Sequence, residues 1–300
     1  MASGRRDRRK SGLERYDRHM KYQELYQWGV SELKEVSIEE AELDARLLLE
    51  EVCATDRNYL LVHGEEAVSE EQQKCYVNYI SRRKCHEPLQ QITGYQEFMG
   101  LKFKVSSKVL IPRQDTETLT EEAMRFLHDG MRILDICTGS GCILLSLLRY
   151  SNDCVGVGCD ISEDAIRLAK DNAETLKLSA DFIQSDLFEK VEGKFDIIVS
   201  NPPYIPSSVI AALMEEVREY EPHLALDGGE DGLDFYRRII SQAENYLYSG
   251  GMLFLEIGCE QAKEIKALME NAGYQEVTVC QDLAGLDRVV YGNYLRTGKV

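Results

Sequence analysis

The sequence predicts an α/β fold in which a doubly wound parallel sheet of seven strands follows a small helical domain. From residue 131 onward, short apolar and β-branched runs alternate with segments of helical periodicity, which is typical of a parallel sheet covered by helices. Residues 20–86 show helical periodicity alone. Between these regions, residues 92–105 alternate apolar and polar side chains around glycines 94 and 100, which predicts a β-hairpin.

Composition and charge limit the class of protein. No apolar run is long enough to cross a membrane, and 300 residues suffice for one large or two modest domains. The formal net charge of -17 argues against nucleic acid or anionic membranes as partners of the whole surface. The nine cysteines form no C-x-x-C pair and no Cys/His cluster, so no metal site is expected. Their odd number and the lack of a signal peptide favour the reduced cytoplasm.

Residues 1–19 are expected to form a disordered basic tail, because arginine and lysine dominate the start of the chain and apolar residues are nearly absent. A mitochondrial presequence is the alternative, although acidic residues interrupt the basic run. Residues 20–87 are expected to form a helical domain for recognition or support. Its predicted helices include 39–52, with Ser37 as N-cap, and 69–83, with Ser69 as N-cap.

Pro88 is expected to end the helical region, and residues 88–110 to form a β-hairpin linker. The segment that follows contains Arg113 and Glu117. An ion pair between these two side chains is the favoured interpretation, and the alternative is that both face an active site.

Residues 111–300 are expected to form the doubly wound domain. Its predicted strands are 132–136, 155–160, 182–183, 195–199, 252–257, 277–280 and 288–291. Its predicted helices are 143–148, 163–176, 234–247 and 260–271. Ligands of such sheets bind at the carboxyl ends of the strands, where the strand order reverses. The residues that follow the strands are therefore the candidates for a site.

A nucleoside site is predicted at these ends. In the loop 137–141, Gly139 and Gly141 let the backbone approach a ligand with no Cβ in the way, and Asp160 can accept hydrogen bonds from ribose hydroxyls. The loop lacks both the G-x-G-x-x-G spacing of a pyrophosphate site and the G-K-[ST] of a P-loop, so a ligand without phosphates fits better. Asp186 and Leu187 could contact its base. The alternatives are helix–strand packing for the glycines and capping for the two acids.

A second candidate feature is the stretch Ser200-Asn201-Pro202-Pro203-Tyr204, which follows the strand at 195–199. Its prolines stop the strand and prevent a helical turn, so stiff backbone holds Asn201 at the strand end. The Asn201 side-chain oxygen and the Pro202 carbonyl can accept both N–H bonds of a planar –NH2 group. Tyr204 can pack flat against that group. A proline-rich surface turn is the alternative.

These residues resemble a known family. Residues 135–141, 160, 186–188 and 201–204 are similar to the motifs of class I S-adenosylmethionine-dependent methyltransferases that act on a planar –NH2. Further segments resemble the HemK-type release factor glutamine-N5 methyltransferases, namely 88–92, 94, 98, 100–101, 103, 105, 109–113, 220–222, 225–226, 228–229, 231–233, 255–258, 282–285 and 287–288. The resemblance covers about residues 39 to 292.

The resemblance implies a Rossmann-like class I methyltransferase domain and an enzyme of translation termination. The methyl group of S-adenosylmethionine would pass to the side-chain nitrogen N5 of the glutamine in the Gly-Gly-Gln motif of class 1 peptide chain release factors, leaving S-adenosylhomocysteine. The implied catalytic residues are Asn201, Pro202 and Tyr204. The implied cofactor-binding residues are Cys137, Thr138, Gly139, Ser140, Gly141, Asp160, Asp186, Leu187 and Asn201. The implied substrate-binding residues are Asn201, Pro202, Pro203, Tyr204, Arg113 and Glu117. A cytoplasmic monomer without nucleic-acid or membrane partners is expected.

The chain departs from the family pattern at three places. It has Gln114-Asp115 where the family usually has Pro-Glu, Gln91 where an aromatic is usual, and Cys137 where glycine is frequent. Three other functions compete with the favoured one. One is a nucleic-acid N-methyltransferase, which the acidic charge disfavours. Another is a binding protein with an inactive methyltransferase fold, which the intact motifs disfavour. The third is a dehydrogenase, which the loop spacing disfavours.

Overall fold

The structure, a computed structural model, describes residues 19–295. The predicted basic tail lies outside these residues except for its last position. The chain divides into two compact units, Met1–Thr93 and Gly94–Val300.

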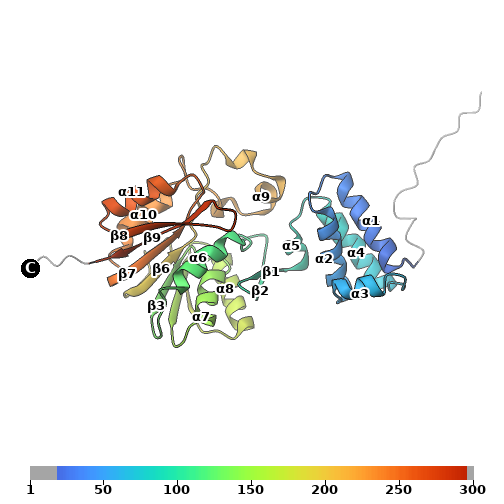
Figure 1. Cartoon of the computed structure of the whole chain (residues 1–300), viewed down its shortest axis with the longest axis horizontal. Helices are drawn as coiled ribbons and strands as arrows, with labels where there is room; N and C mark the ends of the chain where they lie inside the picture. Colours follow the sequence, from blue (N-terminus) through green and yellow to red (C-terminus); the bar gives the residue numbers. More distant parts are fainter. Residues whose placement is uncertain (1–18, 296–300) are drawn as a thin grey trace, which may run out of the picture. The chain divides into compact units, whose positions relative to one another are not determined.

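The described part of the first unit is helical (Figure 1). Its helices are α1 (Tyr22–Glu35), α2 (Ala41–Cys53), α3 (Arg57–Val62), α4 (Glu70–Arg83) and α5 (Leu89–Thr93). Apolar residues at helical spacing meet in one buried core, which includes Leu25, Leu33, Leu48, Tyr76 and Ile80. The predicted helical region is therefore confirmed.

The two predicted N-caps have different outcomes. Ser69 caps α4, because its hydroxyl accepts a hydrogen bond from the backbone N–H of Gln72 at 3.3 Å. The prediction for Ser37 was wrong: α2 begins after Glu40, and Ser37 instead ends α1 with a left-handed φ of 60°. The backbone N–H of Ile38 donates to the carbonyl of Leu33, which completes a Schellman motif.

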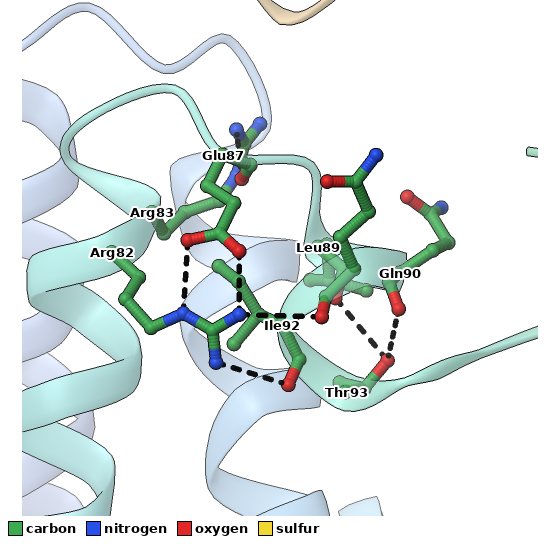
Figure 2. Close-up of polar contacts among 8 residues, drawn as sticks. Arg82, Arg83, Glu87, Leu89, Gln90, Ile92 and Thr93 are labelled. Atoms are coloured by element: carbon green, nitrogen blue, oxygen red, sulfur yellow. Dashed lines mark hydrogen bonds and ion pairs between the residues drawn. The ribbon is translucent and has the colours of Figure 1, made fainter. Parts of the chain in front are cut away.

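Pro88 does not end the helical region as predicted, because α5 follows it directly. The Pro88 carbonyl accepts hydrogen bonds from the backbone N–H groups of Gln91 and Ile92, so this proline starts a helical turn. Figure 2 shows how the turn is held: the Arg82 guanidinium contacts Glu87 and also reaches the carbonyls of Gln91 and Ile92. A cation thereby satisfies carbonyls that the end of a helix leaves unpaired.

The second unit begins with the predicted hairpin. Strands β1 (Tyr95–Phe98) and β2 (Leu101–Lys104) pair in antiparallel fashion. Met99 and Gly100 form the two-residue turn, both with positive φ, which is the geometry that matches the twist of a hairpin.

The second unit is built on one mixed sheet of seven strands in the order β5-β4-β3-β6-β7-β9-β8. The strands are β3 (Arg132–Ile136), β4 (Val155–Asp160), β5 (Asp181–Gln184), β6 (Phe195–Ser200), β7 (Leu247–Glu256), β8 (Gln275–Gln281) and β9 (Asp287–Tyr294). Strand β9 runs antiparallel to both of its neighbours, and the other pairs of this sheet are parallel. The strand count predicted from the sequence is confirmed.

Helices cover both faces of the sheet (Figure 1). They are α6 (Asp115–Met124), α7 (Cys142–Arg149), α8 (Glu163–Leu176), α10 (Asp234–Ala243) and α11 (Ala262–Asn271). The segment between β6 and α10 contains the short helix α9 (Glu215–Tyr220), which buries none of its residues, and 3-10 turns at Ile210–Ala212 and His223–Ala225. Successive strand residues point to opposite faces. Leu134 and Ile136 of β3 therefore pack in the core that includes α10 and α11, while Ile133 packs in the core that includes α6, α7 and α8.

One boundary differs clearly from the prediction. The helix expected over 234–247 ends at Ala243, and β7 starts at Leu247, five residues before the expected strand. Leu247 is 1% exposed and pairs with Phe195 of β6, so a tertiary contact draws this residue into the sheet.

The strand order places the site. Strand β3 lies between β4 and β6. After β3 the chain adds β4 and β5 on one side of it, and it then crosses over to add β6 and the later strands on the other side. The carboxyl ends of β3 and β6 therefore flank the topological switch point, where open α/β sheets bind their ligands. The loop 137–141 and Asn201 follow these two strands.

Candidate active site

A cavity of about 1090 Å³, which includes space open to solvent, lies at this edge of the sheet. Ten of the predicted site residues line it: Arg113, Cys137, Thr138, Gly139, Ser140, Asp160, Asp186, Leu187, Asn201 and Pro203. The other four, Gly141, Glu117, Pro202 and Tyr204, are not among its lining residues. The structure thus brings together the loop, the two acids and the asparagine that the sequence singled out.

The loop after β3 turns tightly. Cys137 and Gly139 have φ values of 60° and 54°, a region that glycine adopts more easily than other residues. The Thr138 hydroxyl donates to the buried carboxylate of Asp135 at 2.6 Å, which anchors the turn. A Cβ added to Gly139 would be 3.7 Å from Val109, whereas one added to Gly141 would be 3.2 Å from the side chain of Ala169. Gly139 therefore leaves room beside the cavity, and Gly141 permits helix packing.

Asp160 lies at the end of β4 and joins two loops. One carboxylate oxygen accepts the Gly139 N–H at 3.0 Å, and the other accepts the Ser162 N–H at 2.9 Å. Burial raises the pKa of this carboxyl, while the hydrogen bonds from the two backbone N–H groups oppose the shift. Asp186, after β5, is paired with Arg238 of α10 at 2.8 Å.

Asn201 is held by its side-chain nitrogen. Its Nδ2 donates to the hydroxyl of Thr116, at 3.3 Å, and Thr116 is a buried residue in the first turn of α6. The backbone that follows is rigidly supported: the Tyr204 carbonyl accepts a hydrogen bond from Gln261 at 3.0 Å, and Gly228 lies against the Tyr204 backbone. Burial raises the pKa of the Tyr204 hydroxyl to about 12, so the phenol stays neutral.

The predicted ion pair between Arg113 and Glu117 does not form. Arg113 pairs with Glu221, whose carboxylate is buried, and Glu117 accepts a hydrogen bond from the backbone N–H of Met99. The reason is tertiary: the packing of the Glu221 segment brings a carboxylate to Arg113 that lies 108 residues further along the chain.

Comparisons with known proteins decide the family. A profile described as "PrmC N-terminal domain" matches residues 24–94, and one described as "Methyltransferase small domain" matches residues 114–228. The release factor glutamine methyltransferase of Clostridium acetobutylicum is 43% identical over 278 residues, which make up 90% of this chain and 98% of that relative. The chain belongs to the release factor glutamine methyltransferase family.

Two further similarities agree with this membership. The release factor glutamine methyltransferase of Geobacter sulfurreducens is 43% identical over 266 residues, covering 88% of this chain and 94% of the relative. A solved methyltransferase structure from Pyrococcus furiosus is 18% identical, with a TM-score of 0.51, and covers 76% of this chain and 100% of that one. The first similarity confirms the predicted enzyme class, and the second supports the fold.

For a methyltransferase of this family the cavity must hold a nucleoside cofactor, and its chemistry fits one. Each oxygen of the Asp160 carboxylate accepts one backbone N–H and retains a lone pair, which matches the two hydroxyl donors of a ribose. Ile161, Leu187 and Phe235 supply apolar lining for a base. The small Gly139 keeps the cavity open beside them.

Sequence reasoning missed several residues of this methyltransferase site. Thr116, Phe235 and Arg238 line the cavity, although they come from α6 and α10 rather than from strand ends. A threonine in a first helical turn and residues of an amphipathic helix carry no distinctive sequence signal. Within residues 19–295, no group of three His, Cys, Asp or Glu side chains is placed to hold a metal ion. None of the helices in this described part has the length and hydropathy that crossing a bilayer requires.

Proposed function

We propose that this enzyme methylates the side-chain amide nitrogen N5 of the glutamine in the Gly-Gly-Gln motif of class 1 peptide chain release factors. The observation that supports this most is the position of Asn201, which lines the same cavity as Gly139 and Asp160. The residue that could accept the substrate amide and the residues that could bind a nucleoside therefore line the same cavity.

The cofactor of the proposed reaction is S-adenosylmethionine, which supplies a methyl group bound to a positively charged sulfur. Asp160 would accept the ribose hydroxyls, and Asp186 and Leu187 would contact the adenine. The backbone of the loop after β3 would lie against the cofactor, and its proposed contacts are Cys137, Thr138, Gly139, Ser140 and Gly141, with Asn201 closing the site. Gly141 contributes through its effect on loop shape, because it does not line the cavity.

Asn201, Pro202 and Tyr204 would hold the substrate amide. The nitrogen of the Asn201 side chain is engaged by Thr116, so its oxygen Oδ1 is the atom left to accept an N–H from the substrate. The Pro202 carbonyl would accept the second N–H, and Tyr204 would pack on the amide plane, with Pro203 stiffening the loop. Arg113 and Glu117 would lie near the substrate chain.

This arrangement answers the main difficulty of the chemistry. A carboxamide nitrogen is a poor nucleophile, because its lone pair is delocalised into the carbonyl group. Acceptors on both N–H bonds raise the electron density at nitrogen and fix its direction. Orientation of this kind lowers a barrier by about 7–11 kcal/mol at most. No side-chain base is needed, since the methylated amide loses its proton to water.

The proposal extends to partners and location. Residues 20–87 would recognise the release factor, residues 88–110 would link the parts, and residues 111–300 would carry out the methyl transfer. The enzyme would act as a monomer in the cytoplasm, and the net charge of -17 disfavours nucleic acid and membranes as partners.

The test is methyl transfer from labelled S-adenosylmethionine to a purified release factor, beside a factor whose Gly-Gly-Gln is changed to Gly-Gly-Ala and beside tRNA. We expect label on the unchanged factor alone. Label on tRNA would overturn the substrate in favour of a nucleic-acid methyltransferase. Cofactor binding with no transfer to any of the three would favour an inactive binding protein.

A further inference from the structure

Three buried or half-buried polar side chains form a line at the cavity, and two of them, Asn201 and Thr116, belong to its lining. Asn201 follows β6 and Glu256 ends β7, and the register that pairs Ser200 with Leu255 makes them neighbours at the edge of the sheet. The Thr116 hydroxyl accepts a hydrogen bond from Asn201 Nδ2 at 3.3 Å. Thr116 also lies near enough to the Glu256 carboxylate to lower its pKa. Thr116 and Glu256 are each 2% exposed, so water does not compete for these contacts.

The protons of this line can be assigned by counting donors. A threonine hydroxyl has one proton to donate, and an ionised carboxylate can only accept. When Glu256 is ionised, the Thr116 proton therefore points to Glu256, which leaves the lone pairs of Thr116 Oγ1 facing Asn201. Only the –NH2 end of the Asn201 amide can complement a lone pair, so the oxygen end is turned away from Thr116.

We propose that Thr116 and Glu256 are positioning residues that set which end of the Asn201 amide faces the substrate. This inference rests on the proposed function, in which Asn201 Oδ1 accepts an N–H of the substrate glutamine. With the amide reversed, its –NH2 group would face the –NH2 group of the substrate, and two donors would oppose each other. The loss would fall mainly on turnover, because the contact that is reversed is the one to the substrate amide.

The surroundings of Glu256 support this role. One of its oxygens, Oε2, has no hydrogen-bond partner among the described residues, so the packing of the core does not explain why a carboxylate is buried there. The nearby Arg288 guanidinium donates to Asp282 and to the Ile257 carbonyl. Burial raises the pKa of Glu256 to about 7, while Thr116 and the charge of Arg288 oppose this shift and favour the ionised carboxylate.

The experiment compares Thr116→Val with Thr116→Ser and with a matched control. Thr120→Val removes another fully buried hydroxyl of α6, which donates to the Thr116 carbonyl at 3.4 Å and does not touch Asn201. We expect Thr116→Val to lower kcat about 10- to 100-fold with the S-adenosylmethionine Kd within about twofold, because misorientation of a reacting group costs this much. Thr116→Ser should restore turnover, Thr120→Val should leave it near wild type, and Glu256→Gln should lower it about 3- to 30-fold.

The results separate this inference from the proposed function. If the wild-type enzyme methylates the release factor and Asn201→Ala abolishes transfer, equal kcat values for Thr116→Val and Thr120→Val would overturn the positioning role. If the wild type does not methylate the factor, the proposed function fails. The amide orientation is then read from the side-chain 15N–1H2 resonances of Asn201, which should show contacts to Thr116 and shift in Thr116→Val alone. Contacts of these protons with cavity residues instead would overturn the inference.

Discussion

Arg113 forms an ion pair with Glu221, and this pair connects the segment before α6 to the segment after α9. The Glu221 side chain is 1% exposed and that of Arg113 is 42% exposed. Burial raises the pKa of Glu221, whereas the charge and hydrogen bond of Arg113 oppose the shift. The second Glu221 oxygen has no hydrogen-bond partner among the described residues. Arg113 is therefore the main group that offsets the cost of burying this carboxylate.

Arg113→Ala should therefore lower the free energy of unfolding by about 1–3 kcal/mol, because a buried carboxylate loses its partner. The double variant Arg113→Ala/Glu221→Gln should recover part of this loss, since no charge is then left unpaired. Chemical denaturation measures both. Arg167→Ala, whose pair with Glu163 is exposed, is the control and should change stability by less than about 0.5 kcal/mol. Equal losses in Arg113→Ala and Arg167→Ala would contradict the prediction.

Asn201→Ala should abolish most of the turnover and leave cofactor binding nearly intact. We expect kcat to fall by at least about 100-fold and the S-adenosylmethionine Kd to stay within about threefold, because the oxygen acts on the substrate amide. Steady-state kinetics and calorimetry give the two values. Asn152→Ala, which removes an exposed asparagine paired with Asp129, serves as the control. Parallel losses in turnover and cofactor affinity would count against the role given to Asn201.

Gly139→Ala and Gly141→Ala should fail in different ways. Both residues have positive φ, so each substitution costs about 1–2 kcal/mol in backbone strain. At Gly141 the added Cβ also lies 3.2 Å from the side chains of Ala169 and Leu145, so the free energy of unfolding should fall by about 1 kcal/mol more. At Gly139 the Cβ lies beside the cavity, so the cofactor Kd should rise about tenfold. Thermal unfolding measures stability, and calorimetry measures the cofactor Kd. A larger stability loss in Gly139→Ala, or a larger rise in Kd in Gly141→Ala, would contradict these roles.

The burial of Glu256 predicts opposite pH effects on stability and on turnover. Burial raises its pKa from 4.5 to about 7, so the folded state retains a proton that the unfolded chain releases. This contribution to stability is complete below pH 4.5 and is lost as the pH rises through 7. The total change is on the order of 3 kcal/mol. The charged and titratable groups that face Glu256 are Arg113, Asp115, Cys142, Tyr204, Tyr236 and Arg288.

Turnover should instead rise as the pH approaches and passes 7, because only the ionised Glu256 obliges Thr116 to turn its proton away from Asn201. Glu256→Gln should flatten both profiles. Denaturation and single-turnover rates between pH 5 and 8 test this. If the wild type became more stable than Glu256→Gln as the pH rises from 5 to 8, the predicted direction of the stability change would be wrong.

The exposed apolar residues of α3 should contribute to substrate affinity. Leu61 and Val62 are 72% and 76% exposed, and burial of such side chains against a partner is worth about 1–3 kcal/mol each. Leu61→Ser/Val62→Ser should therefore raise the KM for the release factor about tenfold or more with kcat and cofactor Kd unchanged. Leu43→Ser, on α2, is the control in the same unit. An unchanged KM would remove α3 from the recognition surface.

The sequence alone predicted the strand count, the hairpin, most helices and the residues at the strand ends. Local patterns were sufficient because β-branched runs, helical periodicity and paired turn residues such as Met99-Gly100 act over a few residues. The same local rule explains the errors. Ser37 has the chemistry of an N-cap, yet it ends α1, and Leu247 follows a helical pattern, yet it pairs with Phe195. At Leu247 the tertiary contact with Phe195 decided the conformation, whereas at Ser37 a local Schellman motif replaced the N-cap.

Only the tertiary structure decided the partners of the site residues. Asn201 and Asp160 could be found because a polar residue after a buried strand stands out, and the switch point of the sheet brings such residues together. The sequence could not show that Arg113 pairs with Glu221 or that Thr116 contacts Asn201 and influences Glu256. Hydrogen bonds and ion pairs act over a few ångströms, and the chain segments that supply these partners are 85 to 108 residues apart in the clearest cases. Folding alone brings such groups within reach of each other.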